Sequence, residues 1–148
     1  MPGNPTPIYS KVGAYGQVRV TAGQAYSNGV GTIGTDMFLA FTADATNGSF
    51  VQRVRWSAVS SNVAAPTAAT VGRVFITSNT IVANTVTCSL FQEVALPSVT
   101  AGSSSVATYP VDIPMNIALP PGYGILVTNH SSPAANTAWV ASVVAGNY

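Results

Sequence analysis

The residue choice that most constrains the fold of this chain is its surplus of β-branched side chains. Val, Ile and Thr together account for 43 of the 148 residues, whereas Leu occurs five times and Lys once. Branching at Cβ restricts the first side-chain torsion, which disfavours helices and suits the pleated surface of a strand. The composition therefore predicts an all-β protein.

Alternation of apolar and polar residues locates the strands. Every second residue of the segment 111–119 is apolar, and the segment 16–21 has the same period of two, which places one row of side chains in a core and the other in water. Pro114 cannot donate a ladder hydrogen bond, so we expect its strand at a sheet edge or a bulge. Further strands are expected at 36–43, 50–59, 71–77, 90–96, 123–128 and 139–144.

About eight short strands in a chain of this length fit one domain, since 148 residues suffice for a single core. The segments between the strands are rich in Gly, Pro, Asn and Ser, and none shows the apolar stripe of a helix. We predict a single-domain, two-sheet antiparallel β-sandwich. A jelly roll is the leading topology and an Ig-like sandwich the alternative.

The first dozen residues differ in character from the rest. Three prolines within the first seven residues favour an extended stretch that joins neither helix nor sheet, so we assign 1–12 to an N-terminal arm and 13–148 to the sandwich. Two interpretations stay open. The arm is either a frayed end or a segment that orders against a neighbouring subunit, in which case Ile8 and Tyr9 are its anchors and the candidate protein-interface residues.

Charge is scarce, and this excludes several classes of protein. Only 6% of the residues are charged, where about 25% is usual, and the net charge is +1. The basic residues form no cluster in the sequence larger than Arg53 and Arg55, so we expect no nucleic-acid partner. No stretch of about 18 residues is continuously apolar, and no secretory signal begins the chain. We therefore expect no membrane span and synthesis in a cytosol.

The acid–base inventory predicts no catalytic site. Asp36 and Asp44 flank one strand and so lie near its opposite ends, whereas a general acid and base must lie together. A Ser131, His130 and Asp112 set lacks the Gly-x-Ser-x-Gly turn that would present a nucleophile. We expect the carboxylates to be solvated and His130 to lie in a loop. The protein is predicted not to be an enzyme and to take no small-molecule substrate.

Metal and cofactor sites are not expected either. The single Cys88 and the single His130 lie 42 residues apart without a cluster of acidic residues, so no tetrahedral zinc set is formed. Cys88 is interpreted as a small buried hydrophobe. Residues 29–34 match G-x-G-x-x-G, but a strand is expected after them where dinucleotide binding needs a helix, so we predict an inter-strand loop.

Alternation also predicts which residues next to Trp56 are buried and which are exposed. Arg53 and Arg55 share one face of their strand, opposite Val54 and Trp56. We therefore predict a buried Trp56 and an exposed pair of arginines rather than a stacking platform for a sugar.

The C-terminal part of the chain carries a recognisable pattern. The run Ile-Ala-Leu-Pro-Pro-Gly-Tyr-Gly-Ile-Leu-Val at 117–127 is followed by Trp-Val-Ala at 139–141 and by a final Ala-Gly-Asn-Tyr at 145–148. This succession resembles the close of small tailed-bacteriophage virion proteins, in which a Leu-Pro-x-Gly-Tyr turn joins two strands and the chain ends in Gly-Asp-Tyr. Asn147 stands here where Asp is usual.

The resemblance implies a non-enzymatic virion structural protein, most simply a capsid decoration or cement protein on the phage head. Its expected partners are the major capsid protein or other virion proteins, and we expect a homodimer or homotrimer located in the virion. One alternative is another head or tail component, such as a fibre or baseplate protein. A second is a lectin-like carbohydrate-binding module, whose candidate residues are Tyr26, Asn28, Tyr123, Asn129 and His130.

Overall fold

The structure is a computed structural model that describes residues 10–61, 65–78, 85–101 and 107–148. Within these ranges it is all-β, as the composition predicts, and its strands form two four-stranded antiparallel sheets and one two-stranded sheet. The strands are β1 (Val12–Val20), β2 (Val30–Thr32), β3 (Phe38–Thr42), β4 (Ser49–Ser60), β5 (Thr70–Thr77), β6 (Thr85–Thr87), β7 (Ser89–Leu96), β8 (Val111–Leu119), β9 (Gly124–Asn129) and β10 (Thr137–Asn147).

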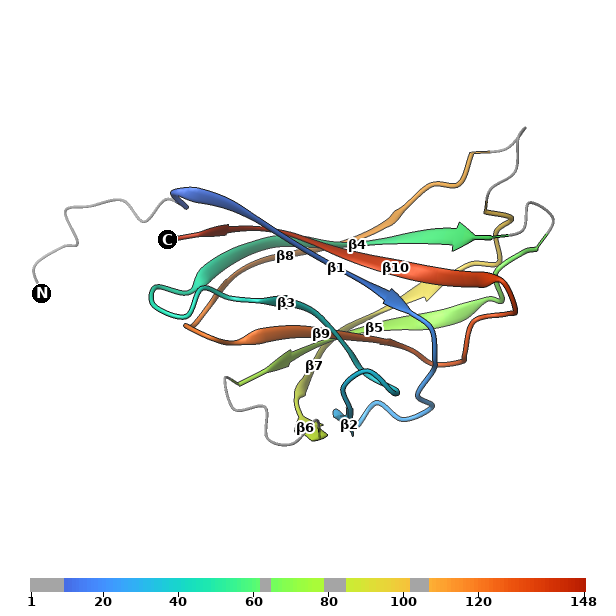
Figure 1. Cartoon of the computed structure of the whole chain (residues 1–148), viewed down its shortest axis with the longest axis horizontal. Helices are drawn as coiled ribbons and strands as arrows, with labels where there is room; N and C mark the ends of the chain where they lie inside the picture. The colour runs from blue at the N-terminus through green and yellow to red at the C-terminus, as the bar shows by residue number, and fades with distance from the viewer. Residues whose placement is uncertain (1–9, 62–64, 79–84, 102–106) are drawn as a thin grey trace, which may run out of the picture.

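The two large sheets face each other as a sandwich (Figure 1). Sheet I has the strand order β1-β10-β4-β8 and sheet II the order β3-β9-β5-β7. Leaving β2 and β6 aside, the first of the eight remaining strands pairs with the last, the second with the seventh, the third with the sixth and the fourth with the fifth. This is the pairing of one long hairpin rolled into two sheets, which defines a jelly roll. The leading prediction for the topology is confirmed.

All eight strands expected from the sequence are present, with ends that move by at most four residues. The structure adds β2 and β6, which pair with each other and were not expected. β2 lies inside the glycine-rich 29–34 segment, where turn residues hide a strand of three residues that is too short to show a period.

Pro114 lies both on an edge strand and at a bulge, the two positions expected for it from the sequence. β8 is an edge strand, since it pairs with β4 alone, and the register of that pair shifts between Val51 and Arg53, opposite Ile117 and Pro114. Asn116, within the bulged stretch, has a φ of 51°. The missing N–H of proline therefore interrupts no regular ladder.

The main core lies between the two sheets. Trp56 and Trp139 are 0% and 1% exposed and are the largest fully buried side chains, which confirms the prediction for Trp56. Around them pack inward-facing residues from the strands of both sheets, including Val20, Phe41, Val54, Leu96, Ile113, Ile125 and Val143.

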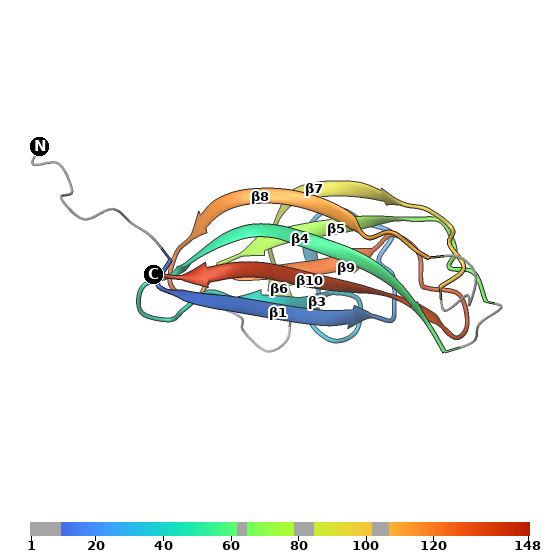
Figure 2. The ribbon, with the colours of Figure 1, turned by 90° about the horizontal axis from the view of Figure 1, so that it is seen from above.

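The outer faces of the two sheets differ. Phe75 and Leu126 point away from the main core and are covered by Met37, with Ile33, Leu39 and Cys88 packed beside them. The residues that cover this face come from the connections that contain β2 and β6, which lie below sheet II in Figure 1. All six residues of β9 are buried as a result. The outer face of sheet I, seen in Figure 2, has no such cover among the described residues.

The C-terminal pattern forms a turn and a terminal anchor. Gly122 has a φ of 74°, and the Tyr123 N–H donates to the Pro120 carbonyl at 3.2 Å, so the expected tight turn is present. Asn147 accepts a hydrogen bond from the Ser49 hydroxyl at 2.6 Å. Its side-chain oxygen thus ties the end of β10 to the start of β4.

Candidate functional site

The two candidate interface residues from the sequence, Ile8 and Tyr9, lie outside the described residues. The described chain starts just beyond them. The Lys11 N–H donates to the Asn147 carbonyl at 2.7 Å, and β1 begins at Val12. Lys11 and Val12 therefore belong to the sandwich although the sequence placed them in the arm.

The acidic residues at the ends of β3 organise the loops next to them. Asp44 accepts hydrogen bonds from the backbone N–H groups of Thr46 and Asn47, which lowers the pKa of its carboxyl. Asp36 accepts from the Thr32 N–H at 2.6 Å, next to β2. Both carboxylates shape loops at strand ends, the position assigned to them from the sequence.

The three residues considered as a triad have separate partners. Asp112 on β8 forms an ion pair with Arg55 at 2.7 Å, and this pair holds the pKa of Asp112 below its usual range. The His130 ring lies against Arg73 on sheet II. The Ser131 N–H donates to the Thr70 hydroxyl. The Asp112 and His130 side chains are therefore engaged on different sheets, and Ser131 makes its contact through the backbone.

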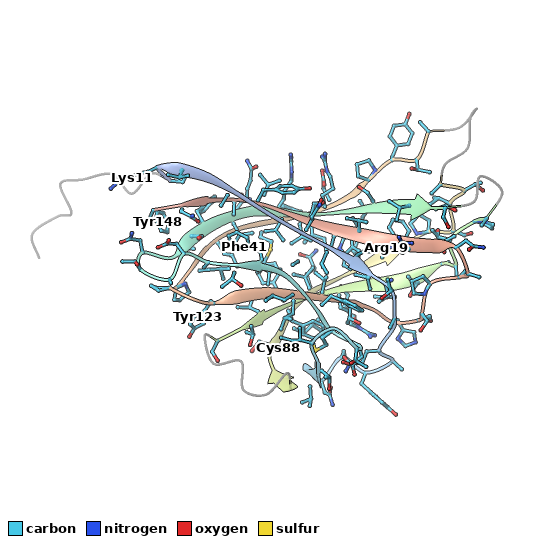
Figure 3. All side chains as sticks on the ribbon, in the orientation of Figure 1. Lys11, Arg19, Phe41, Cys88, Tyr123 and Tyr148 are labelled. Atoms are coloured by element: carbon cyan, nitrogen blue, oxygen red, sulfur yellow. The ribbon has the colours of Figure 1, made fainter. Side chains whose placement is uncertain are left out.

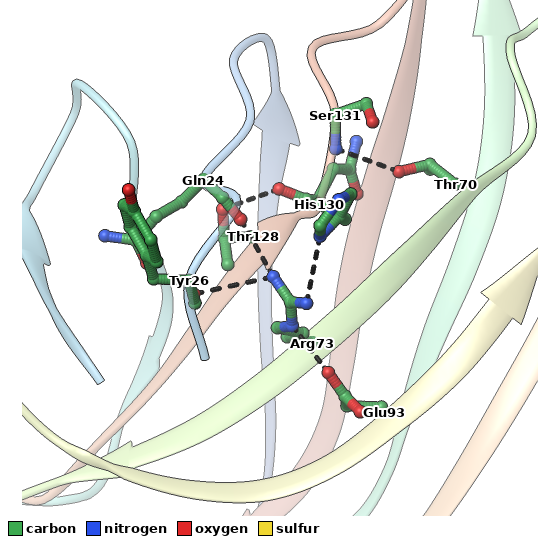
Figure 4. A network of polar contacts seen from close by, with 9 residues as sticks. Gln24, Tyr26, Thr70, Arg73, Glu93, Thr128, His130 and Ser131 are labelled. Atoms are coloured by element: carbon green, nitrogen blue, oxygen red, sulfur yellow. Dashed lines mark hydrogen bonds and ion pairs between the residues drawn. The ribbon is translucent and has the colours of Figure 1, made fainter. Parts of the chain in front are cut away.

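A polar network around Arg73 lies at one end of sheet II and was not predicted (Figure 4). Arg73 is only 6% exposed, although it carries a full charge. Its Nε donates to Glu93 at 2.6 Å, its Nη1 to the carbonyls of Gln24 and Tyr26 at 2.8 and 3.5 Å, and its Nη2 lies 3.1 Å from His130 Nδ1. We call these contacts the Arg73 network.

The Arg73 network joins segments far apart in the sequence. It ties β5 to β7, to the connection after β1 and to the start of the loop after β9. A buried cation needs such partners, because an unpaired one would be strongly disfavoured. The only signal in the sequence is a single Arg inside an otherwise uncharged strand, and that signal does not identify its partners.

Of the residues proposed for a lectin-like site, Tyr26 and His130 both contact Arg73, whereas Tyr123 lies apart from them. Tyr123 precedes β9 and Asn129 ends it, so the six residues of the strand, about 20 Å, separate them. Figure 3 shows Tyr123 at the end of the sandwich away from Arg19. Asn129 is also 0% exposed, so its amide is not presented to a sugar.

Cys88 lies half-buried next to the cover of sheet II. Desolvation by burial raises the pKa of its thiol to about 11, and the Sγ donates to the Gly29 carbonyl at 3.1 Å. Cys88 was expected to be a small buried hydrophobe, and in the structure it packs beside apolar residues but is only partly buried. The glycine-rich segment 29–34, which contains the Gly29 partner of Cys88, forms β2 and a turn rather than a strand-to-helix junction.

We expect Cys88 to react slowly with iodoacetamide in the folded protein. With a pKa of about 11, only about 0.1% of the thiol is ionised at pH 8, against about a quarter of a free cysteine. Alkylation at pH 8 should be at least about 100-fold slower in buffer than in 8 M urea, and should accelerate as the pH rises. Since the chain has one cysteine, mass spectrometry reads this site alone. Equal rates in both solvents would contradict the burial.

The outer face of sheet I gathers residues from all four of its strands, and we call it the open face. β-Pairing sets outward-pointing side chains side by side in rows. Tyr15, which is 61% exposed, and Phe50, at 36%, supply aromatic surface. The rows are Tyr15–Val144–Arg53–Pro114, Gln17–Ser142–Arg55–Asp112 and Arg19–Val140–Ser57.

The open face holds a large share of the few charges in the protein. Arg19, Arg53 and Arg55 stand against Asp112, a net charge of +2. The other charged residues of the chain, Lys11 and Arg73 against Asp36, Asp44 and Glu93, sum to −1. Within the described residues, the side chains of Arg19 and Arg53 form no ion pair and donate no hydrogen bond. Sequence spacing linked Arg53 with Arg55, but only strand pairing brings Arg19 to the same face.

Two shallow hollows indent the open face. One is lined by Phe50, Gln52 and Val144 with neighbouring residues, and the other by Gln52, Arg53, Asp112, Pro114 and Asn116. The bulge of β4 against β10 places Gln52 and Arg53 together at this surface, and Gln52 lines both hollows.

Comparisons with known proteins add one structural similarity. No protein-family model and no curated protein matches the sequence. A solved structure described as the cyanophage Pam1 capsid asymmetric unit is similar, with a TM-score of 0.42 and 14% identity over the whole of both chains. Over the described ranges, no group of three or more His, Cys, Asp or Glu residues could hold a metal ion. The same ranges contain no helix long and apolar enough to span a membrane.

Proposed function

We propose that this chain is a non-enzymatic virion structural protein that binds the outside of a phage head as a decoration or cement protein. The observation that carries the proposal is a jelly roll in which loops cover the outer face of one sheet, whereas none of the described residues covers the outer face of the other. Jelly rolls are common in viral capsid and lectin domains. An open sheet face that combines exposed aromatic residues with arginines suits contact with another protein, since both kinds of residue are enriched at protein interfaces.

The acid–base groups support a structural role. Arg73, Glu93 and His130 hold sheet II to its loops, and Arg55 pairs with Asp112 across β4 and β8. In each case the polar side chain stabilises a strand or a connection. The lectin-like alternative is less well supported, because its candidate residues lie at both ends of the sandwich.

The proposal is tested with virions that lack this chain. Purified protein is added to their isolated heads and to their isolated tails, and binding is measured by co-sedimentation. We expect saturable binding to heads at a fixed stoichiometry and retention of the packaged genome at higher temperature. Binding to tails alone would favour the fibre or baseplate alternative. Binding to neither particle, together with glycan binding on an array, would favour the lectin-like alternative.

The N-terminal arm is part of the same proposal, with Ile8 and Tyr9 as its anchors on a neighbouring subunit. Deleting residues 2–9 should leave the sandwich folded, because β1 begins at Val12. The loss should weaken head binding, since each large apolar side chain that becomes buried contributes about 1.5 to 3 kcal/mol. Calorimetry measures folding and co-sedimentation measures binding.

The matched control replaces residues 2–7 with Gly and Ser and keeps Ile8 and Tyr9. This variant should bind heads like the full chain. If the 2–9 deletion also binds as tightly as the full chain, the arm is a frayed end.

A further inference from the structure

We propose that the open face of sheet I is the docking surface and that its partner is an acidic protein surface. The inference rests on the proposed function and specifies which side of the sandwich meets the shell. Its main observation is that strand pairing collects Arg19, Arg53 and Arg55 on one face that carries a single carboxylate, Asp112. The rest of the molecule has a net charge of −1.

Two of the arginines are free to pair with a partner. Arg55 is engaged by Asp112, whereas Arg19 and Arg53 have no ion pair within the described part of the chain. Arg53 lines the hollow that also includes Asp112 and Pro114. Because Arg55 already neutralises Asp112, a carboxylate entering that hollow would meet the guanidinium of Arg53. Guanidinium groups bind carboxylates with two parallel hydrogen bonds, which fixes orientation as well as charge.

The composition of the open face fits a protein partner. Tyr15 and Phe50 stand beside the arginines, and Tyr and Arg are among the residues that dominate the energetics of protein interfaces. Three arginines are too few for the repeated phosphate contacts that nucleic acids require. The uncharged residues between the arginines, such as Ser142 and Val144, cost little free energy to desolvate.

A second copy of the chain does not fit this face. Two open faces brought together would each carry a net charge of +2, and like charges oppose one another across an interface. The four strands have 9, 11, 12 and 9 residues and lie about 4.8 Å apart, so the face presents only about 650 Å², less than the roughly 800 Å² per partner of a stable complex. An acidic shell that offers many equivalent sites supplies both the opposite charge and the additional area.

The test measures binding of the protein to heads that lack the chain, as a function of salt. The triple variant Arg19→Gln, Arg53→Gln and Arg55→Gln should bind about 10- to 100-fold more weakly at low salt and should lose most of the salt dependence. The control changes net charge equally by Ser89→Glu, Gln92→Glu and Ala95→Glu, all exposed on β7 of sheet II. It should bind within about twofold of the unmodified protein, since its charges lie away from the contact.

Two single variants separate docking from stability. Arg55→Gln and Asp112→Asn break the same ion pair, so a purely structural role predicts similar effects of both. Docking to an acidic surface predicts that the two substitutions change the association rate in opposite directions. Arg55→Gln should slow association several-fold, whereas Asp112→Asn, which raises the charge of the open face, should speed it.

The outcomes distinguish this inference from the proposed function. If the unmodified protein fails to bind heads, the proposed function is overturned. If it binds and the triple variant binds like the control, the open face is not the docking surface. Binding of the unmodified protein to duplex DNA or to anionic vesicles, lost in the triple variant, would replace the acidic protein by a phosphate-bearing partner.

Discussion

Replacing Arg73 with Ala is expected to lower the free energy of unfolding by about 3 kcal/mol, because it removes one side of a buried charged network. The substitution leaves the Gln24 carbonyl without its donor and Glu93 without its cation. It also frees the connection after β1 from β5, so hydrogen exchange in residues 21–30 should accelerate. Urea denaturation followed by Trp fluorescence measures the stability, since Trp56 and Trp139 are both buried.

The matched control is Glu93→Gln. The Glu93 side chain is 45% exposed, and its replacement keeps a hydrogen-bond acceptor facing Arg73 Nε. We expect a loss below about 1 kcal/mol, as for other partly exposed ion pairs. Equal losses from the two substitutions would mean that the ion pair itself, rather than the buried guanidinium and its carbonyl partners, stabilises this end of sheet II.

Replacing Gly16 with Ala is the second substitution with a large expected effect. Gly16 faces inward on β1 where this strand crosses β3, and a Cβ there would lie 2.1 Å from the Ala40 carbonyl oxygen. The nearest atoms belong to the backbone of Ala40, which cannot rotate away as a side chain could. We expect a loss of roughly 3 kcal/mol, measured by thermal or urea unfolding, since sheets I and II must separate at this edge.

Gly13→Ala provides the control in the same strand. A Cβ at Gly13 would meet nothing within 4 Å. Replacing a glycine with alanine where space is available stabilises a protein by about 0.4 to 1 kcal/mol, because it lowers the conformational entropy of the unfolded chain. If both substitutions destabilise the protein equally, β1 needs glycine for a reason other than its contact with β3.

The class of fold and the positions of most strands could be predicted from local sequence. Segment 111–119 illustrates this, since its alternation marks inward and outward residues that the structure places as expected. Pro114 also predicted that its strand lies at an edge or contains a bulge, because the missing N–H of proline can be read directly from the sequence. The short β2 could not be predicted, because three residues that include Gly31 carry no periodic signal.

The candidate site was predictable only in part. Alternation placed Arg53 and Arg55 on the exposed side of β4, opposite the buried Trp56. Arg19 joins them because β10 lies between β1 and β4, an arrangement that depends on the order of strands in the sheet. The partners of Arg73 come from segments 20 to 57 residues away, and no spacing rule covers such distances.

The sequence by itself determined that this protein is all-β, that Trp56 is buried and that the chain carries few charges, because residue choice and a period of two act over neighbouring residues. Only the tertiary structure decided that the hairpin rolls into a jelly roll, that loops cover sheet II and that three arginines share the open face of sheet I. These features depend on contacts between strands far apart in the chain. Burial of apolar side chains from distant strands in a common core stabilises these features against the entropic cost of closing long loops, and no local pattern encodes that balance.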